Sequence, residues 1–167
     1  TWEGIAKEVV EEPEPIQRIR LRIGREGEAR FLSHLEMQSA WVRALRRARA
    51  PLAYSKGFHA HPKIAFATAA PLGEESTGDY MDVWLKEHLF ADELLARLKV
   101  TLPTGFHAYA AEDVPLRGDA LMAMVSGFEY IIHTDGAPAD LADRVAAMNA
   151  AESVMVSRRV KAKGGKK

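Results

Sequence analysis

A run of alternating aliphatic and arginine residues at 17–24 (QRIRLRIG) constrains the fold of this chain more than any other segment. Successive side chains of a β-strand point to opposite faces of a sheet, so strict alternation is typical of a half-buried strand. We therefore expect Ile19, Leu21 and Ile23 to face a core. The residues between them would line the opposite face of the sheet, and these are Arg18, Arg20 and Arg22.

A helix is predicted to begin after Ser33. Ser33 and Glu36 have the spacing of a capping box, in which each side chain satisfies an otherwise unpaired backbone N–H group at the helix start. Apolar residues then recur at helical spacing as far as Pro51, which cannot continue a helix. This apolar stripe consists of Met37, Trp41, Leu45 and Ala48.

Hydrophobic periodicity also predicts three further strands and a second helix. Short apolar or alternating runs predict strands at 64–69, 79–87 and 106–114. A helix is predicted at 90–98, and its inward residues would be Phe90, Leu94, Leu95 and Leu98. The resulting order, βαββαβ, is typical of a ferredoxin-like α+β domain, in which one antiparallel sheet carries both helices on one face.

A further β-α-β unit is predicted beyond this domain. Residues 121–134 contain a strand pattern, residues 138–151 a helix pattern and residues 153–161 a second strand pattern. The unit either begins an incomplete second ferredoxin-like half or extends the first sheet. The chain would then comprise an acidic linker or helix at 1–15, the ferredoxin-like domain at 16–118, the additional unit at 119–160 and a basic tail at 161–167. Both ends are typical of an excised domain, so we expect a longer parent protein.

Charge is distributed unevenly, although the formal net charge is zero. Residues 16–63 contain eleven Lys and Arg against three Glu, whereas residues 64–157 contain five Lys and Arg against fifteen Asp and Glu. A basic surface attracts polyanions; the alternative is that the two blocks pair with each other across the fold. The chain has no Cys, which excludes cysteine-based zinc and iron–sulfur sites and cysteine nucleophiles from it. A cysteine-free chain fits a reducing compartment, and we expect a cytoplasmic protein without a membrane segment.

The sheet face opposite the predicted helices is the first candidate site. On the strand at 79–87, Tyr80 and Trp84 fall on the side of the arginines, and His107 and Tyr109 are candidates for the same face. Single-stranded RNA is bound by cations that contact phosphates and by flat rings that stack on bases. The alternative is that the later unit packs on this face and buries the rings as core.

Four arginines of the first helix form a second candidate site, and they are Arg43, Arg46, Arg47 and Arg49. An arginine side chain can bind a phosphate through two parallel hydrogen bonds. A solvated helix face, partly paired with acidic residues elsewhere, accounts equally well for the cluster.

The loop at 51–63 holds the third candidate set. His59 and His61 would bind a divalent metal if His34 converged on them, although their spacing is a weak signal for a metal site. A loop histidine could instead act as general acid or base in metal-independent RNA cleavage. The plain alternative is an ordered loop whose histidines hydrogen-bond to the backbone. Two basic residues that flank the histidines would meet phosphate, namely Lys56 and Lys63.

Four segments of the chain resemble a known bacterial family. They are FLSHLE at 31–36, RALRRA at 43–48, YSKGFHAHPKI at 54–64 and PLGEESTGDY at 71–80. These motifs are similar to those of the radical SAM-associated domain, domain of unknown function 2344, and the resemblance spans roughly residues 16–160. The chain departs from the family pattern at Glu36, Ser39, Asp79 and the pair His59-Ala60. Because the family usually carries Asn at position 59, the resemblance disfavours a mechanism that requires His59.

The resemblance implies an RNA or ribosome context and a radical SAM protein as partner, in cis or in trans. We therefore expect a non-catalytic RNA-binding accessory module that presents RNA to a catalytic partner and holds no cofactor or metal. The expected RNA-binding residues are Arg18, Arg20, Arg22, Arg43, Arg46, Arg47, Lys56, His59, His61, Lys63, Tyr80 and Trp84. Two alternatives stay open: an adaptor that docks on a radical SAM enzyme or a ribonuclease, and a metal-independent endoribonuclease that uses the loop histidines.

Overall fold

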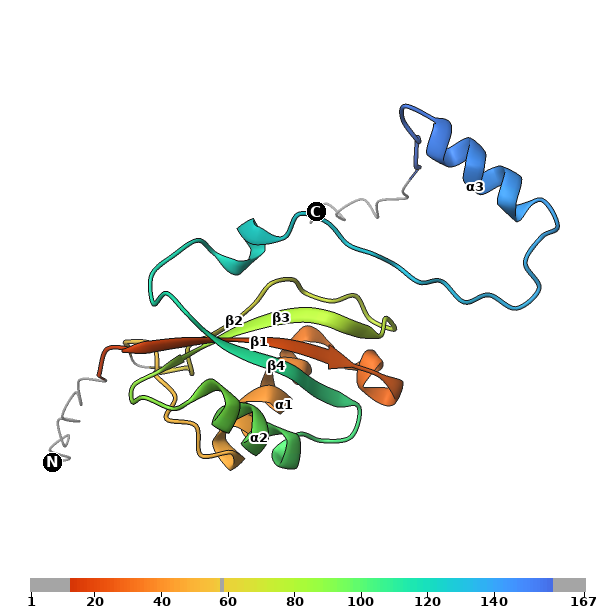
Figure 1. Cartoon of the computed structure of the whole chain (residues 1–167). Coiled ribbons are helices and arrows are strands. Elements are labelled where there is room, and N and C mark those ends of the chain that lie inside the picture. Colours follow the sequence, from red (N-terminus) through yellow and green to blue (C-terminus); the bar gives the residue numbers. More distant parts are fainter. Residues whose placement is uncertain (1–12, 58, 158–167) are drawn as a thin grey trace, which may run out of the picture. The chain divides into compact units, whose positions relative to one another are not determined.

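The computed structural model describes residues 13–57 and 59–157 of the chain (Figure 1). The chain divides into two compact units, Thr1–Phe128 and Glu129–Lys167. Within the described residues, none of the helices combines the length and the apolar character needed to cross a membrane.

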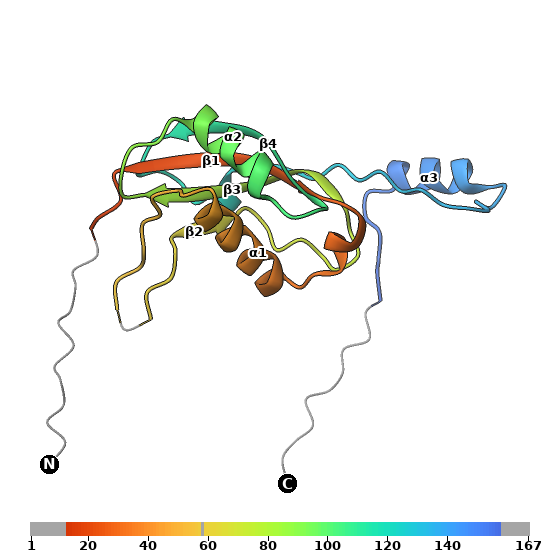
Figure 2. The same ribbon diagram turned by 90° about the horizontal axis from the view of Figure 1, so that it is seen from below.

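The first unit places two helices on a four-stranded antiparallel sheet. Its elements are β1 (Gln17–Arg25), η1 (Gly27–Phe31), α1 (His34–Arg47), β2 (Ile64–Phe66), β3 (Ser76–Leu85), α2 (Ala91–Thr101), β4 (Phe106–Val114) and the 3-10 turn η2 (Leu121–Met124). The strand order across the sheet is β2-β3-β1-β4. Both helices lie on one face of the sheet, as Figures 1 and 2 show from the side and from below. A mixed α and β fold with one antiparallel sheet is therefore confirmed.

The core lies between the sheet and the two helices. Ile19, Leu21 and Ile23 of β1 are at most 3% exposed, as the alternation predicts. The ring of Trp41 meets that of Phe106 edge to face, with the ring centroids 6.0 Å apart. The same cluster contains further buried side chains from α1, β3 and α2, among them Met37, Leu45, Met81, Val83, Leu85, Leu94 and Leu98. The apolar face of each main element thus contributes to one core, whose burial stabilises the sheet against the helices.

The predicted capping box at the start of α1 is confirmed. Ser33 Oγ accepts a hydrogen bond from the Glu36 N–H at 3.4 Å, and Glu36 Oε2 accepts one from the Ser33 N–H at 2.8 Å. The Ser33 hydroxyl also donates to Glu36 Oε2, at 2.7 Å. This hydrogen bond and the one from the Ser33 N–H favour the ionised carboxyl group and hold the pKa of Glu36 below its ordinary value. The helix ends at Arg47, before Pro51, as expected.

The prediction that Phe90 packs inward as part of α2 is wrong. Phe90 is the N-cap of α2 rather than a residue of its apolar stripe, and 81% of its surface is exposed. The helix begins one residue later, at Ala91, so Phe90 keeps an extended backbone and lies outside the helical periodicity. Leu94 and Leu98, which lie one helical turn apart in the predicted stripe, are fully buried.

Of the predicted additional β-α-β unit, the described residues form only the helix. Helix α3 (Leu141–Ala150) matches the predicted helix at 138–151. Neither predicted strand forms within the described part of 121–157, which contains η2 and otherwise irregular backbone around α3. A strand persists only when a neighbour takes up its backbone hydrogen bonds, and the apolar side chains that suggested strands stay exposed, Ile132 by 84% and Met155 by 95%.

Three parts of the predicted organisation lie outside the described residues. They are residues 1–12 of the acidic linker, residues 158–161 of the last predicted strand and the basic tail at 161–167.

Candidate functional site

The sheet face that α1 and α2 leave open carries the arginines of β1. The register between β1 and β3 sets their neighbours, and the pairs are Arg18 with Trp84, Arg20 with Asp82 and Arg22 with Tyr80. The structure divides this face into two parts. The covered half comprises Arg18, Arg20, Asp82 and Trp84, and the uncovered half comprises Arg22, Tyr80, His107 and Tyr109.

Asp82 is the centre of the covered half, and its side chain is fully buried. It accepts hydrogen bonds from Arg18 Nε and from Arg20 Nε, each at 2.9 Å, and both guanidinium groups also donate to it through Nη2. The hydrogen bond to this carboxylate raises the pKa of Arg20 above its ordinary value. Arg18 also lies over the Trp84 ring, with Cζ 5.0 Å from the ring centroid. Two of the three β1 arginines that were expected to contact RNA are therefore already paired with Asp82 inside the sheet.

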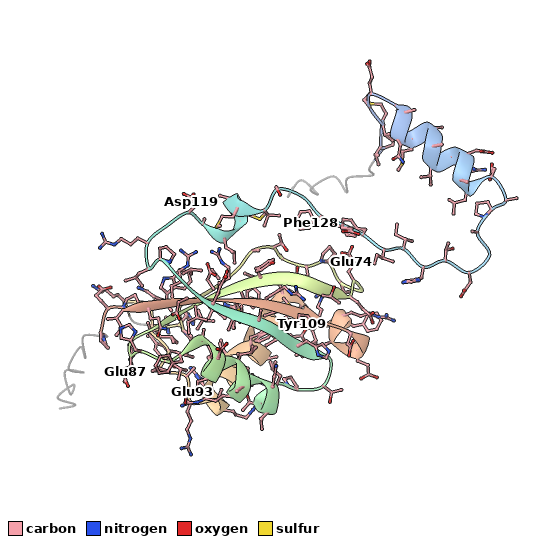
Figure 3. The ribbon with its side chains drawn as sticks, in the orientation of Figure 1. Glu74, Glu87, Glu93, Tyr109, Asp119 and Phe128 are labelled. Atoms are coloured by element: carbon pink, nitrogen blue, oxygen red, sulfur yellow. The ribbon has the colours of Figure 1, made fainter. Side chains whose placement is uncertain are left out.

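The segment after β4 returns over this ion-paired cluster. Figure 3 shows Asp119 on that segment, on the side of the sheet away from α1 and α2. The Asp119 carbonyl oxygen accepts a hydrogen bond from Arg18 Nη2 at 3.3 Å, and Met124 Sδ lies 3.4 Å from Arg20 Nη1. Leu121 in the same segment is only 6% exposed. Later residues thus pack on this half of the open face, as one part of the alternative interpretation held, but they leave Trp84 half-buried rather than in the core.

The uncovered half presents one arginine and three rings. Arg22 is exposed, and its Cζ lies 5.2 Å from the centroid of the Tyr109 ring. His107 stacks on Tyr109, with 5.7 Å between centroids and 13° between ring planes. Tyr80 is 39% exposed and lies across from Arg22 on β3. Among the residues described, Arg22 has no acidic ion-pair partner, in contrast to Arg18 and Arg20.

A glycine positions the Tyr109 ring against the sheet. A Cβ atom at Gly24 would lie 2.7 Å from Tyr109 Cε2 and 2.4 Å from the Ser76 carbonyl oxygen, so only a glycine fits beneath the ring. A register shift between β1 and β4, located between Arg22 and Ile23, changes the pairing just before this point. Sequence reasoning missed Gly24, although a glycine inside an alternating strand is a signal of close approach.

The three histidines do not form a metal site. In the part of the chain that the structure describes, no group of three His, Cys, Asp or Glu side chains could hold a metal ion. His34 meets the Phe66 ring edge-on at 5.4 Å, whereas His59 and His61 are exposed in the loop. The loop is closed by its backbone, because the Ser55 N–H donates to the His61 carbonyl at 2.8 Å and the His61 N–H donates to Ser55 Oγ at 3.0 Å.

The loop at 51–63 joins the sheet beside the covered half. The Ala53 N–H donates to the Trp84 carbonyl, and the Trp84 N–H donates to the Lys63 carbonyl. From this anchor the loop projects away from the sheet (Figure 2). Lys56 Nζ lies 2.6 Å from Glu14 Oε1. This hydrogen bond and the charge of Lys56 hold the pKa of Glu14 below its ordinary value.

The arginines of α1 lie on the helical side of the molecule, apart from the open face. Arg47 Nη2 donates to the Thr101 carbonyl at 2.7 Å and so joins the ends of α1 and α2. Arg46 Nη2 lies 3.3 Å from the Tyr54 hydroxyl. Arg43 is exposed beside them. The residues expected to bind RNA thus fall into separate places, and only Arg22 and Tyr80 belong to the uncovered half.

Comparison with known proteins gives a family and no characterised relative. No curated protein and no solved structure matches the chain. A family profile described as an uncharacterized protein conserved in bacteria (DUF2344) matches residues 18–167. Because the match covers all but the first residues of the chain, this protein belongs to that uncharacterized bacterial family, DUF2344.

Proposed function

We propose that this protein binds single-stranded RNA, without cleaving it, through the uncovered half of its sheet. The observation that carries the proposal is the guanidinium of Arg22, which has no acidic ion-pair partner among the described residues and lies over the exposed ring of Tyr109, with the exposed Tyr80 beside Arg22 on the neighbouring strand. A guanidinium at this position would contact a phosphate, and the two rings would stack on neighbouring bases. The covered half would act as the rigid support of this platform.

The topology of the first unit supports the same proposal. The element order βαββαβ and the strand order β2-β3-β1-β4 lead us to assign a ferredoxin-like domain. RNA-recognition modules built on a four-stranded sheet use exposed aromatic residues of that sheet to stack bases. One fold can carry many unrelated functions, so the residues of the uncovered half remain the basis of the proposal.

We further propose that the protein is an accessory module of a cytoplasmic radical SAM enzyme and presents RNA to it. This part rests on the sequence resemblance alone. The iron–sulfur cluster of such an enzyme would belong to the partner, since this chain contains no Cys to hold one.

Fluorescence anisotropy with labelled single-stranded RNA, at several salt concentrations, tests the RNA proposal. Arg22→Gln should weaken binding about tenfold and reduce the salt slope by about 0.7, because one phosphate contact is lost. Tyr109→Leu should weaken binding by about 1–3 kcal/mol through the loss of a stacking face. The control is Lys99→Gln, which removes an exposed charge from α2 on the opposite side of the sheet.

The proposal fails if wild-type protein does not bind RNA at low salt, or if Arg22→Gln and Tyr109→Leu both bind RNA as tightly as wild type. The first result would favour a protein–protein adaptor. The second would move the RNA site away from the uncovered half.

A further inference from the structure

A hollow of about 420 Å³ lies where α1 ends and the loop to β2 begins. Its lining includes three cations, one tyrosine and one carboxylate, namely Arg46, Arg49, Lys86, Tyr54 and Glu87. Glu87 and Tyr109 lie toward opposite ends of the sheet in Figure 3. The hollow is therefore a different place from the uncovered half.

Arg49 has an unusual backbone conformation. Its φ is +53°, and it is the only non-glycine residue with a positive φ among the described residues. The Ala50 N–H donates to the Leu45 carbonyl at 3.1 Å, and the Arg49 N–H donates to the Arg46 carbonyl at 3.0 Å. These two hydrogen bonds form a Schellman motif, in which the residue at the position of Arg49 is usually glycine. An arginine therefore occupies a position where its own backbone is disfavoured.

Capping of the helix does not explain the Arg49 side chain. Arg97 Nη1 already donates to the Ala48 carbonyl at 3.2 Å and to the Arg49 carbonyl at 3.3 Å. Arg46 and Arg47 lie in the last turn of α1, where cations complement the helix dipole. Other side chains thus provide donors and positive charge at the C-terminal end of α1. A glycine at position 49 would adopt the left-handed backbone of the turn with less strain than an arginine.

The charges of the hollow are not balanced. Within the described residues, none of its three cations forms an ion pair, although six ion pairs of arginine or lysine occur elsewhere. Glu87 is the one carboxylate in the lining, which leaves an excess of two positive charges. That excess would balance the charge of about −1.5 to −2 that a phosphate monoester carries near neutral pH. Arg46 also lies over the Tyr54 ring, with Cζ 5.9 Å from the ring centroid. The lining of the hollow therefore includes a guanidinium group in contact with an aromatic ring.

We propose that this hollow binds a phosphate monoester, with Arg46, Arg49 and Lys86 as its cationic ligands. Arginine and lysine donors around an open hollow are the usual means of holding a phosphate through charge-assisted hydrogen bonds. The same monoester occurs on a free nucleotide and on the 5′-phosphorylated end of an RNA chain. The left-handed backbone of Arg49 is retained because it directs this guanidinium to the ligand.

The test uses the full chain and three probes: adenosine 5′-monophosphate, a 5′-phosphorylated uridine hexamer and the same hexamer with a 5′-hydroxyl end. Isothermal titration should show binding of the monophosphate or tighter binding of the phosphorylated hexamer than of the hydroxyl hexamer. Monophosphate binding identifies a nucleotide site, and a preference confined to the hexamers identifies a site for an RNA end. Equal affinity for the two hexamers, together with no binding of the monophosphate, overturns the proposal.

Two variants separate ligand binding from structure. Arg49→Gly should weaken phosphate-dependent binding at least about tenfold, the loss expected for one charge-assisted contact, while its melting temperature stays equal or rises because glycine suits the left-handed turn. Lys86→Gln should weaken the same binding, and Lys99→Gln should not. A lower melting temperature for Arg49→Gly with unchanged binding would show that the side chain is structural, and would overturn the proposal. Binding of the hydroxyl hexamer does not need a terminal phosphate, so it measures the sheet site of Arg22 and Tyr109 separately. A negative result for the phosphate site can therefore be distinguished from a negative result for the sheet site.

Discussion

Asp82 supplies the negative charge that two neighbouring arginines need in order to be buried. Arg18 is 5% exposed and Asp82 is fully buried, so their ion pair is shielded from water. Asp82→Ala would leave two guanidinium groups without a carboxylate, and we expect a loss of about 3–5 kcal/mol in the free energy of unfolding. Urea denaturation measures this loss directly.

A triple variant serves as the control for Asp82. Arg18→Met and Arg20→Met combined with Asp82→Leu replace the whole ion cluster by apolar groups of similar size. This protein should unfold near the wild-type midpoint, because no buried charge is left unpaired. A small effect of Asp82→Ala alone would mean that water reaches these guanidinium groups freely.

Gly24 and Gly78 offer a matched pair of substitutions on the open face. A Cβ at Gly24 meets the Ser76 backbone at 2.4 Å and the Tyr109 ring at 2.7 Å, whereas a Cβ at Gly78 meets no atom within 4 Å. Gly24→Ala should destabilise the protein by about 1–3 kcal/mol through overpacking and should displace Tyr109. Gly78→Ala should have little effect on stability. Equal urea midpoints for the two variants would contradict the close packing of Tyr109 on β1.

At the scale of elements, the start of α1 depends on its capping box. Ser33→Ala should reduce the free energy of unfolding by about 1 kcal/mol, because the Glu36 N–H loses its acceptor. Ser39 lies in the interior of the same helix, and its hydroxyl donates to the Leu35 carbonyl of the preceding turn at 2.8 Å. Ser39→Ala should therefore leave stability unchanged or raise it, since alanine is the better helix former. Thermal unfolding followed by circular dichroism compares the two variants.

Glu36 gives the same capping box a dependence on pH. Its carboxyl pKa is lowered in the folded protein from an ordinary value of 4.5. A lowered folded pKa means that the stabilising contribution is complete above the unfolded value and is lost as the pH falls through the folded value. The stability difference between wild type and Glu36→Gln should thus shrink as the pH is lowered below about 4.5. Urea midpoints measured from neutral to acidic pH follow this change, and a difference that stays constant with pH would contradict it.

On the scale of the whole molecule, the first unit extends past its last strand. Residues 119–128 belong to this unit, and Leu121 among them is buried against the open face. A chain that ends at residue 118 should be less stable than one that ends at residue 128 by about 1.5–3 kcal/mol, the value for burying one leucine side chain. Urea denaturation of the two proteins tests this expectation. Equal stabilities would show that the returning segment contributes little to the covered half.

Much of the first unit was predictable because its elements rest on local periodicity. The alternation at 17–24, the capping box at Ser33 and the apolar stripe of α1 each depend on backbone geometry within a few residues. The strands predicted at 121–134 and 153–161 do not form in the described residues, because local periodicity is not sufficient for a strand. A strand pattern is satisfied only by a hydrogen-bonding neighbour, and for the described residues no neighbour is supplied.

The sequence by itself determined which residues of β1 face the core and which face away, because that choice depends only on the two-residue repeat of an extended chain. Only the tertiary structure decided which of the outward arginines stays available. Asp82 is more than sixty positions from Arg18 and Arg20 in the chain, and strand register brings it beside them. The returning segment with Leu121 then covers that pair and leaves Arg22 exposed with Tyr80 and Tyr109. Ion pairing and burial depend on contacts between distant segments, and no local pattern encodes them.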